Sequence, residues 1–123
     1  NMNVRRIGYV ASLITKHGGI AICAPIAPYR KTRREVREMV EKYGGFIEVH
    51  MATPLEECER RDVKGLYAKA RSGEIIQFTG ISDPYEVPTN AELSIDTSGI
   101  APEKSCEMVV HKLIQLGYVQ KDD

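Results

Sequence analysis

The sequence predicts an α/β fold built on a parallel sheet. Short apolar runs typical of buried strands alternate with longer segments of helical periodicity, and this alternation is the pattern of a sheet covered by helices. The strand-like runs are residues 20–26, 46–52 and 92–97. Three strands make a thin sheet, so we expect further strands upstream of these residues in a longer polypeptide.

The first segment shows the periodicity of a helix from the beginning of the sequence. Its apolar positions follow the spacing i, i+3, i+4 and i+7 and are Ile7, Val10, Ala11 and Ile14. The pair Gly18-Gly19 predicts the end of this helix. The run IAICAPI at residues 20–26 is too short for a typical helix. Its continuous apolar character predicts a strand that is buried on both faces.

Two capping boxes predict where the next two helices begin, since a Thr followed three residues later by Glu can satisfy free backbone groups at a helix start. Thr32 with Glu35 predicts the start of the second helix. Thr53 with Glu56 predicts the start of the third. Pro54 then falls at the first helical position, where its missing N–H costs nothing.

The remaining regular elements follow from the same periodicities. FIEVHMA at 46–52 predicts the second strand, and ELSIDT at 92–97 predicts the third. The last helix is expected to end at Gly117. Its apolar face consists of Cys106, Val109, Val110, Leu113 and Ile114.

Residues 62–81 are predicted to form a lid. The segment holds Lys64, Lys69 and Arg71 and is bounded by glycines, a composition that suits a mobile flap able to bring cations to phosphate groups. Closing such a flap would exclude water and strengthen each electrostatic contact. Phe78 has polar neighbours on both sides, so we interpret it as a platform for a planar base. Partial burial in a core is the alternative for this ring.

Charge excludes some partners and leaves one local question open. The 123 residues, enough for one domain, carry 17 basic and 17 acidic side chains, so no overall field attracts nucleic acid or an anionic membrane. Residues 29–37, YRKTRREVR, are strongly basic. This run is either a local anion site or a solvated helix face with i,i+4 pairs such as Arg34–Glu38 and Arg37–Glu41.

Cysteine usage and hydropathy indicate a cytoplasmic setting. Cys23, Cys58 and Cys106 are odd in number and lack CxxC spacing, which argues against a disulfide framework or a zinc site. No apolar run approaches the ~20 residues that a membrane-spanning helix needs. The three histidines have no ligand spacing, and we expect no metal site formed by protein side chains of this chain.

Taken in order, several segments resemble the adenylyl-sulfate kinase family. They are NVRRIGYVA (3–11), IAPYRKTRREVR (26–37), PLEECERRDVKGLYAKARSGEI (54–75), FTGISDPYEVP (78–88) and LSIDT (93–97). The resemblance implies a three-layer α/β fold with the parallel sheet of the P-loop nucleotide kinases. It also implies transfer of a phosphoryl group from Mg-ATP to the 3′-hydroxyl of adenosine 5′-phosphosulfate (APS), giving 3′-phosphoadenosine 5′-phosphosulfate, with Mg²⁺ as the cofactor.

The resemblance also assigns candidate substrate-binding residues. Phe78 resembles the aromatic residue that stacks on the adenine of APS, with Gln77 beside it. Lys64 resembles the lid lysine that reaches the phosphosulfate. The other residues implied on the APS side are Asn3, Ile26, Ala27 and Arg30.

On the ATP side the resemblance implies three residues. Cys58 and Arg61, in the CERRD segment, would face ATP. Thr97 lies in the turn after the last strand, where kinases of this fold hold the ATP base.

The sequence departs from the family pattern in two places. Ala27 stands where the family often has a serine, so we expect direct transfer without a phosphorylated serine. No GxxxxGK[ST] segment occurs in the sequence. Such a loop provides the backbone cradle for ATP phosphates and a hydroxyl ligand for Mg²⁺. We therefore expect this loop upstream in the natural polypeptide, and we expect residues 1–123 alone to be inactive.

A second function stays open. Ala27 also fits a kinase-like regulatory domain of an ATP sulfurylase, which would bind the phosphorylated product without catalysis. The complete KGLY and FTG segments of the lid favour the enzyme. ATP, APS, an associated or fused ATP sulfurylase and further copies of the chain are the expected partners.

Overall fold

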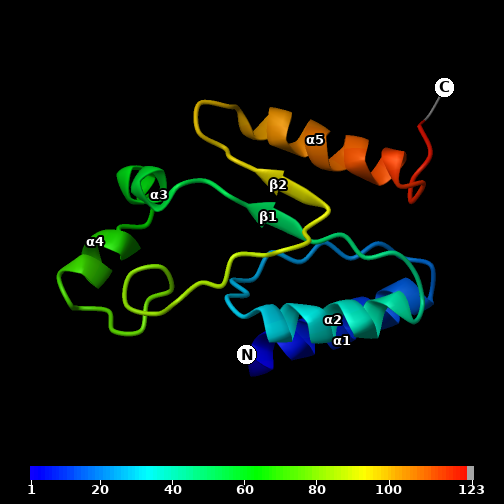
Figure 1. Ribbon diagram of the computed structural model, residues 1–123, viewed down its shortest axis with the longest axis horizontal. Helices are drawn as coiled ribbons and strands as arrows, with labels where there is room; N and C mark the ends of the chain where they lie inside the picture. The colour runs from blue at the N-terminus through cyan, green and yellow to red at the C-terminus, as the bar shows by residue number, and fades with distance from the viewer. Residues whose placement is uncertain (122–123) are drawn as a thin grey trace. The chain divides into compact units, whose positions relative to one another are not determined.

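The computed structural model describes residues 1–121 and contains, in that part of the chain, helices and two short strands (Figure 1). Their order is α1 (Met2–Lys16), α2 (Arg30–Glu41), β1 (Val49–Met51), α3 (Leu55–Arg61), α4 (Leu66–Arg71), β2 (Leu93–Ile95) and α5 (Pro102–Gln115). The chain divides into two compact units. The helical unit is Asn1–Phe46 with Tyr85–Pro88, and the sheet unit is Ile47–Pro84 with the residues from Thr89 onward.

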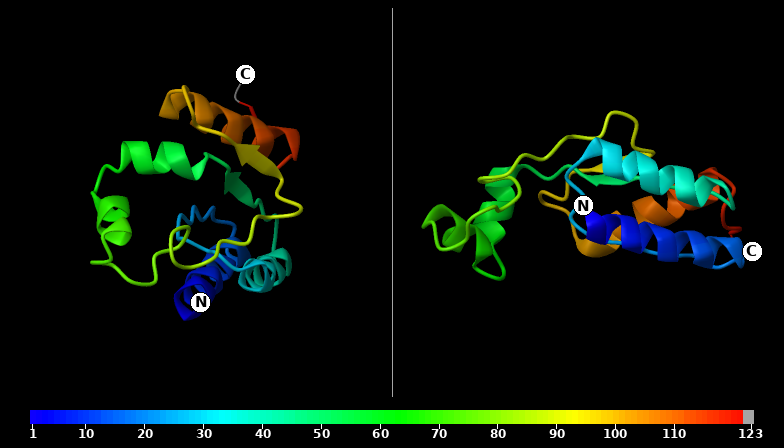
Figure 2. Two further views of the ribbon diagram at one scale, coloured as in Figure 1. Left: turned by 60° about the vertical axis from the view of Figure 1, so that its left-hand side comes forward. Right: turned by 90° about the horizontal axis from the view of Figure 1, so that it is seen from below.

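In the helical unit, α1 and α2 lie side by side (Figures 1 and 2). The buried positions of α1 are mostly small and recur at helical spacing: Val4, Gly8, Ala11 and Ser12. A Cβ on Gly8 would lie only 2.5 Å from Cγ2 of Val36 on α2. The absence of a side chain at Gly8 therefore sets how closely the two helices approach.

The predicted first helix is confirmed, but its predicted apolar stripe is only partly buried. Ala11 is buried as expected, whereas Ile7 and Ile14 are each more than a third exposed and Val10 is 54% exposed. The buried face is rotated toward Gly8 because small side chains permit close helix packing that the larger ones would prevent. Periodicity located the helix but selected the wrong face of it.

The strand predicted at 20–26 is absent from the structure. These residues are extended without regular pairing, and Ile22 is 94% exposed. A parallel strand needs a neighbour for its backbone hydrogen bonds and cover on both faces. The described residues of the helical unit include no strand that could supply either.

The other two strands form within the predicted ranges 46–52 and 92–97, but each is only three residues long, and they pair in parallel. Val49 is opposite Leu93, His50 is opposite Ser94 and Met51 is opposite Ile95. Ile95 is only 1% exposed and is the most deeply buried large side chain of the described chain. The helix α5 follows β2 and packs against it, and Gly117 ends the last turn with φ +77°, as predicted. The α/β class with a parallel sheet is therefore confirmed.

The two predicted capping boxes are not formed. The helix α2 begins at Arg30, with Tyr29 at the N-cap position, and Thr32 is buried within the first turn. Glu35 instead accepts a hydrogen bond from Arg5 of α1 at 2.5 Å. In α3, Pro54 occupies the N-cap position, and the Thr53 hydroxyl is engaged by Thr97. Contacts between distant segments have replaced the local caps in both helices.

The lid segment contains one short helix, α4. Among residues 1–121, no helix has the length and apolar content needed to cross a membrane.

Candidate functional site

The carboxyl end of β2 is joined to α3 by a hydrogen-bond network. The hydroxyl oxygens of Thr53 and Thr97 lie 2.6 Å apart, and the backbone N–H of Thr97 donates to Thr53 Oγ1 at 3.0 Å. Arg61 donates from Nη1 to Thr97 Oγ1 at 2.8 Å and from Nη2 to the Thr97 carbonyl at 2.9 Å. The structure thus brings together Arg61 and Thr97, which were both expected on the ATP side.

The Arg61 guanidinium is also held by Glu57. Its Nε donates to Glu57 Oε1 at 2.8 Å, and Arg60 donates to both Glu57 oxygens at 2.7 Å. Hydrogen bonds from Arg60 and Arg61 lower the pKa of Glu57 to about 2. Arg61 is therefore a fixed cation at the end of β2, oriented through three of its nitrogens.

Cys58 lies in the middle of α3. Its sulfur is 3.9 Å from the carbonyl oxygen of Thr53, and its side chain is half-buried. The pKa of Tyr67 on α4 is raised, mainly by burial of its side chain and secondly by the neighbouring Cys58. Cys58 and Thr97 thus both contact Thr53, and Arg61 contacts Thr97, all within the sheet unit.

The segment predicted to be a lid begins at a strained residue that also caps α4. Asp62 has φ +25°, an unusual value for a residue other than glycine. Its carboxylate accepts the backbone N–H groups of Tyr67 and Ala68, each at 3.0 Å. Gly65 follows in the left-handed region, with φ +65°. Between these residues, Lys64 is exposed.

Phe78 sits in a tight turn of the lid segment. Its ring packs edge to face on Tyr67, with centroids 5.1 Å apart and an interplanar angle of 70°. Its backbone N–H donates to Ser82 Oγ at 2.7 Å. The ring is half-buried, and its neighbour Gln77 is exposed with φ +61°. The Phe78 ring therefore packs on Tyr67 and also keeps accessible surface. This fits both a platform for a planar base and partial burial in a core.

The remaining candidate residues belong to the helical unit. Ala27 and Arg30 lie in and beside the turn that leads into α2, and Ala27 is half-buried. Arg30 donates from Nε to the carbonyl of Val87 at 2.7 Å. Asn3 and Ile26 are exposed. A common pocket for all seven APS-side residues stays a prediction, and so does the lid at 62–81.

Sequence reasoning missed several residues of these networks. Thr53 was assigned to a helix cap, whereas its hydroxyl bonds to Thr97. Glu57 orients Arg61, and the i,i+4 spacing of the two could have indicated this. The roles of Arg33 and Glu86 had no local signal, because their partners are far away in the sequence. The predicted Arg37–Glu41 pair is present at 3.2 Å.

The family model described as adenylylsulphate kinase matches residues 1–96 of this chain. The chain belongs to that family. An adenylyl-sulfate kinase of Picosynechococcus sp. is 53% identical over 117 residues, a match that spans 95% of this chain and 64% of the relative. The chain thus covers slightly less than two thirds of that protein's length.

Two further proteins are similar to this chain. A solved structure of the Mycobacterium tuberculosis APS kinase, in complex with AMPPNP and APS, is 40% identical with a TM-score of 0.85 and covers 91% of this chain and 65% of that one. A sulfate adenylyltransferase of Phaeosphaeria nodorum is 52% identical over 114 residues, which are 93% of this chain and 19% of that protein. The likeness to solved structures supports the kinase fold expected from the sequence.

The described side chains of this adenylylsulphate kinase family member do not by themselves form a metal site. Among residues 1–121, no three His, Cys, Asp or Glu side chains are grouped so that they could hold a metal ion. Mg²⁺ often keeps several waters and binds through one or two carboxylates together with substrate phosphates. The described residues do not form a complete site for the ion.

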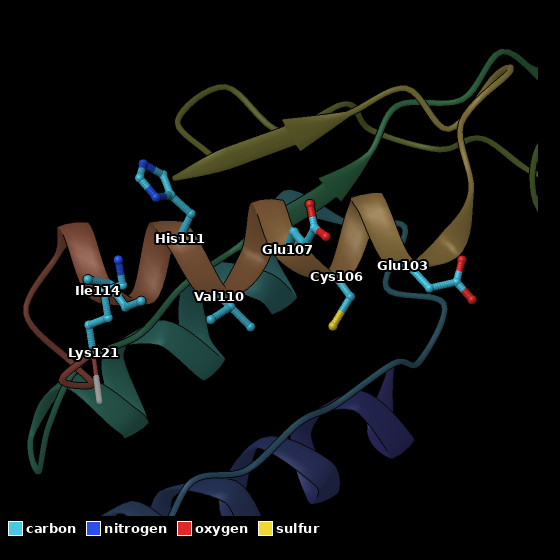
Figure 3. Close-up of a pocket in the computed structure, with 7 residues that line it drawn as sticks. All are labelled: Glu103, Cys106, Glu107, Val110, His111, Ile114 and Lys121. Carbon is cyan, nitrogen blue, oxygen red and sulfur yellow. The ribbon is translucent and has the colours of Figure 1, made fainter. Parts of the chain in front are cut away.

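A hollow along α5 lies apart from the candidate residues of this family member. Figure 3 shows Cys106 and Val110 on one side of the helix, with Ile114 farther along it. Glu103, Glu107, His111 and Lys121 also line the hollow, and none of the candidate residues for APS or ATP is among its lining residues. The hollow is therefore a poor candidate for the nucleotide site.

Proposed function

We propose that the natural polypeptide containing these residues transfers the γ-phosphoryl group of ATP to the 3′-hydroxyl of APS. The observation that carries the proposal is the likeness, over 91% of the chain, to a solved kinase in complex with AMPPNP and APS. The 3′-oxygen attacks the γ-phosphorus, the bond to the β-phosphate oxygen breaks, and the hydroxyl proton is released. The products are ADP and 3′-phosphoadenosine 5′-phosphosulfate.

On the APS side, the proposal gives each residue a physical task. Phe78, supported at its edge by Tyr67, stacks on the adenine ring, and base–aromatic stacking is worth ~1–3 kcal/mol. Lys64 is exposed at the beginning of the lid and neutralises part of the phosphosulfate charge when the lid closes. Asn3, Ile26, Ala27, Arg30 and Gln77 complete the proposed APS site.

On the ATP side, the fixed guanidinium of Arg61 and the turn at Thr97 support the nucleotide. Cys58, in the middle of the same helix, provides part of the surface. Because Arg61 is already bonded to Glu57 and Thr97, it contributes an oriented charge without reorganisation. These residues bind and orient ATP, and none of them is assigned as a proton acceptor.

Two components of the reaction are proposed to come from outside these residues. The sequence contains no GxxxxGK[ST] segment, so another segment would cradle the ATP phosphates. Mg²⁺ would arrive with ATP and neutralise phosphate charge. Because position 27 is alanine, transfer would be direct, which suits a reaction that depends mainly on positioning and charge neutralisation.

A coupled assay tests this proposal. The natural polypeptide is incubated with Mg-ATP and APS, and ADP release is followed, with adenosine 5′-phosphate replacing APS as the control substrate. We expect ADP release that depends on APS, and residues 1–123 alone are expected to be inactive. ADP release that is independent of APS, or no turnover at all, would refute the kinase.

A regulatory domain is the second candidate, and it rests on a specific observation. The chain is 52% identical to part of a sulfate adenylyltransferase, and Ala27 removes the family serine. In this case the polypeptide would bind 3′-phosphoadenosine 5′-phosphosulfate tightly without turnover. Titration with that nucleotide beside the kinase assay separates the two functions.

We also propose a cytoplasmic setting and self-association. The thiols of Cys23, Cys58 and Cys106 are free in the structure, which suits a reducing compartment. A homo-oligomer and an association or fusion with ATP sulfurylase remain proposals, and the molar mass of the natural polypeptide in solution tests both.

A further inference from the structure

Residues 85–88 are bound to the turn that leads into α2, within the helical unit. The backbone N–H of Glu86 donates to the Pro28 carbonyl at 2.8 Å. Arg30 returns a bond from Nε to the Val87 carbonyl at 2.7 Å. Residues 85–88, which follow the predicted lid in sequence, are therefore hydrogen-bonded to Pro28 and to Arg30 at the start of α2.

One side chain bridges the two segments. Arg33 donates from Nη1 to the Ala27 carbonyl and from Nη2 to the Glu86 carbonyl, each at 2.6 Å. Its guanidinium carbon also lies 5.6 Å from the ring centroid of Tyr85. The planar fork of arginine can hold two acceptors in fixed directions, which a lysine ammonium on a flexible stem does less well.

The Glu86 carboxylate performs a second task at the start of α2. Its Oε2 accepts the backbone N–H of Arg30 at 2.7 Å. The first N–H groups of a helix have no partner within the helix, and a carboxylate is favoured there by the helix dipole. Glu86 thus supplies the cap that the sequence predicted from Thr32, and it fixes the backbone at Arg30.

We propose that Arg33 and Glu86 are positioning residues for APS. They hold residues 27–30 and residues 85–88 together within the helical unit, so that APS meets a preformed segment at the start of α2. This inference rests on the proposed function, because Ala27 and Arg30 matter only if the polypeptide binds APS. It assigns no contact between Arg33 or Glu86 and the nucleotide.

The test uses the natural polypeptide and measures dissociation constants for APS and ATP separately. We expect Arg33→Ala to weaken APS roughly tenfold, as expected for loss of hydrogen bonds from a charged donor, and to change ATP less than twofold. Arg33→Lys should restore little, because it keeps the charge without the fork. Glu86→Gln should retain near-wild-type affinity, since its amide oxygen can accept the Arg30 N–H, whereas Glu86→Ala should weaken APS. Arg34→Ala, an exposed neighbour on α2, is the matched control.

Amide exchange of the same variants separates this proposal from the proposed function. Residues 85–88 and the start of α2 should exchange faster in Arg33→Ala than in the wild type, with or without nucleotide. Equal losses for APS and ATP, or unchanged APS affinity, would overturn the positioning role. If the wild type binds neither nucleotide, the proposed function fails and the positioning role fails with it, while the exchange data still report whether the bridge forms.

Discussion

The carboxylate of Glu59 on α3 accepts two hydrogen bonds from the guanidinium of Arg71 on α4. Nε lies 2.6 Å from Oε1, and Nη2 lies 3.2 Å from Oε2. The hydrogen bond from Arg71 lowers the pKa of Glu59, and the same bond raises the pKa of Arg71. In the structure, a cation of the lid segment thus ties the lid helix to the helix before it.

Breaking this pair is predicted to loosen α4. Because the Arg71 side chain is 59% exposed, Arg71→Ala should leave the thermal midpoint nearly unchanged. It should nevertheless speed amide exchange across residues 66–71, since a helix of six residues is marginal without tertiary support. Lys69→Ala, on the same helix, is the control and should exchange like the wild type. Identical exchange in Arg71→Ala and Lys69→Ala would show that the pair does not hold α4.

Stacking by Phe78 is predicted to favour APS over ATP. Phe78→Ala should weaken APS binding by ~1–3 kcal/mol, the usual value of base–aromatic stacking, with a much smaller effect on ATP. Phe78→Leu separates stacking from bulk, because leucine keeps apolar volume beside Tyr67 without an aromatic face. We expect leucine to restore stability but not APS affinity, as measured by calorimetric titration. Equal losses for both nucleotides would refute the assignment.

The approach of α1 to α2 predicts the effect of a single methyl group. Gly8→Ala places a Cβ 2.5 Å from Val36 Cγ2, and overpacking of this kind costs ~1–3 kcal/mol. The better helix propensity of alanine offsets up to ~1 kcal/mol of that cost. We expect net destabilisation in urea unfolding. The double variant Gly8→Ala/Val36→Ala should be more stable than the sum of the two single changes in unfolding free energy predicts, because Val36→Ala removes the clashing methyl groups. If the two changes in unfolding free energy simply add, the clash does not exist.

The ion pairs of Glu57 predict a loss of stability in acid. Its pKa is lowered from 4.5 to about 2 by Arg60 and Arg61. The stabilisation is therefore present above the unfolded pKa and is lost as the pH falls from about 4.5 toward about 2. Glu57→Gln should lower the urea midpoint at neutral pH and flatten its decline in acid. Glu56→Gln, an exposed change on the same helix, is the control, and an unaltered acid profile in Glu57→Gln would contradict the prediction.

Local sequence located most elements but not what each of them contacts. The spacing of apolar residues identified α1 and α5, and glycines marked where these helices end. The same spacing failed to choose the buried face of α1, because that choice depends on the close fit of Gly8 to Val36. The Thr-x-x-Glu patterns failed for a related reason. Glu86 accepts the N–H of Arg30, where α2 begins two residues before Thr32, and the backbone N–H of Thr97 donates to the Thr53 hydroxyl.

The candidate site was predictable where family motifs name residues and unpredictable where distant segments meet. Arg61 and Thr97 were singled out from their motifs, but their mutual hydrogen bonds arise only when α3 packs at the end of β2. Arg33 and Glu86 carry no motif of their own. Their interaction joins segments that are far apart in the sequence and had to be seen in the fold.

The sequence by itself determined the α/β class, the approximate positions of the helices, the presence of parallel strands within 46–52 and 92–97, and the family. These features follow from periodicity, glycine positions and motifs, which act over a few residues or are recognised as patterns. Only the tertiary structure decided that residues 20–26 remain unpaired and that Glu86 caps α2. Strand pairing and capping satisfy backbone groups, and the partner that satisfies them can come from any segment that the fold brings near.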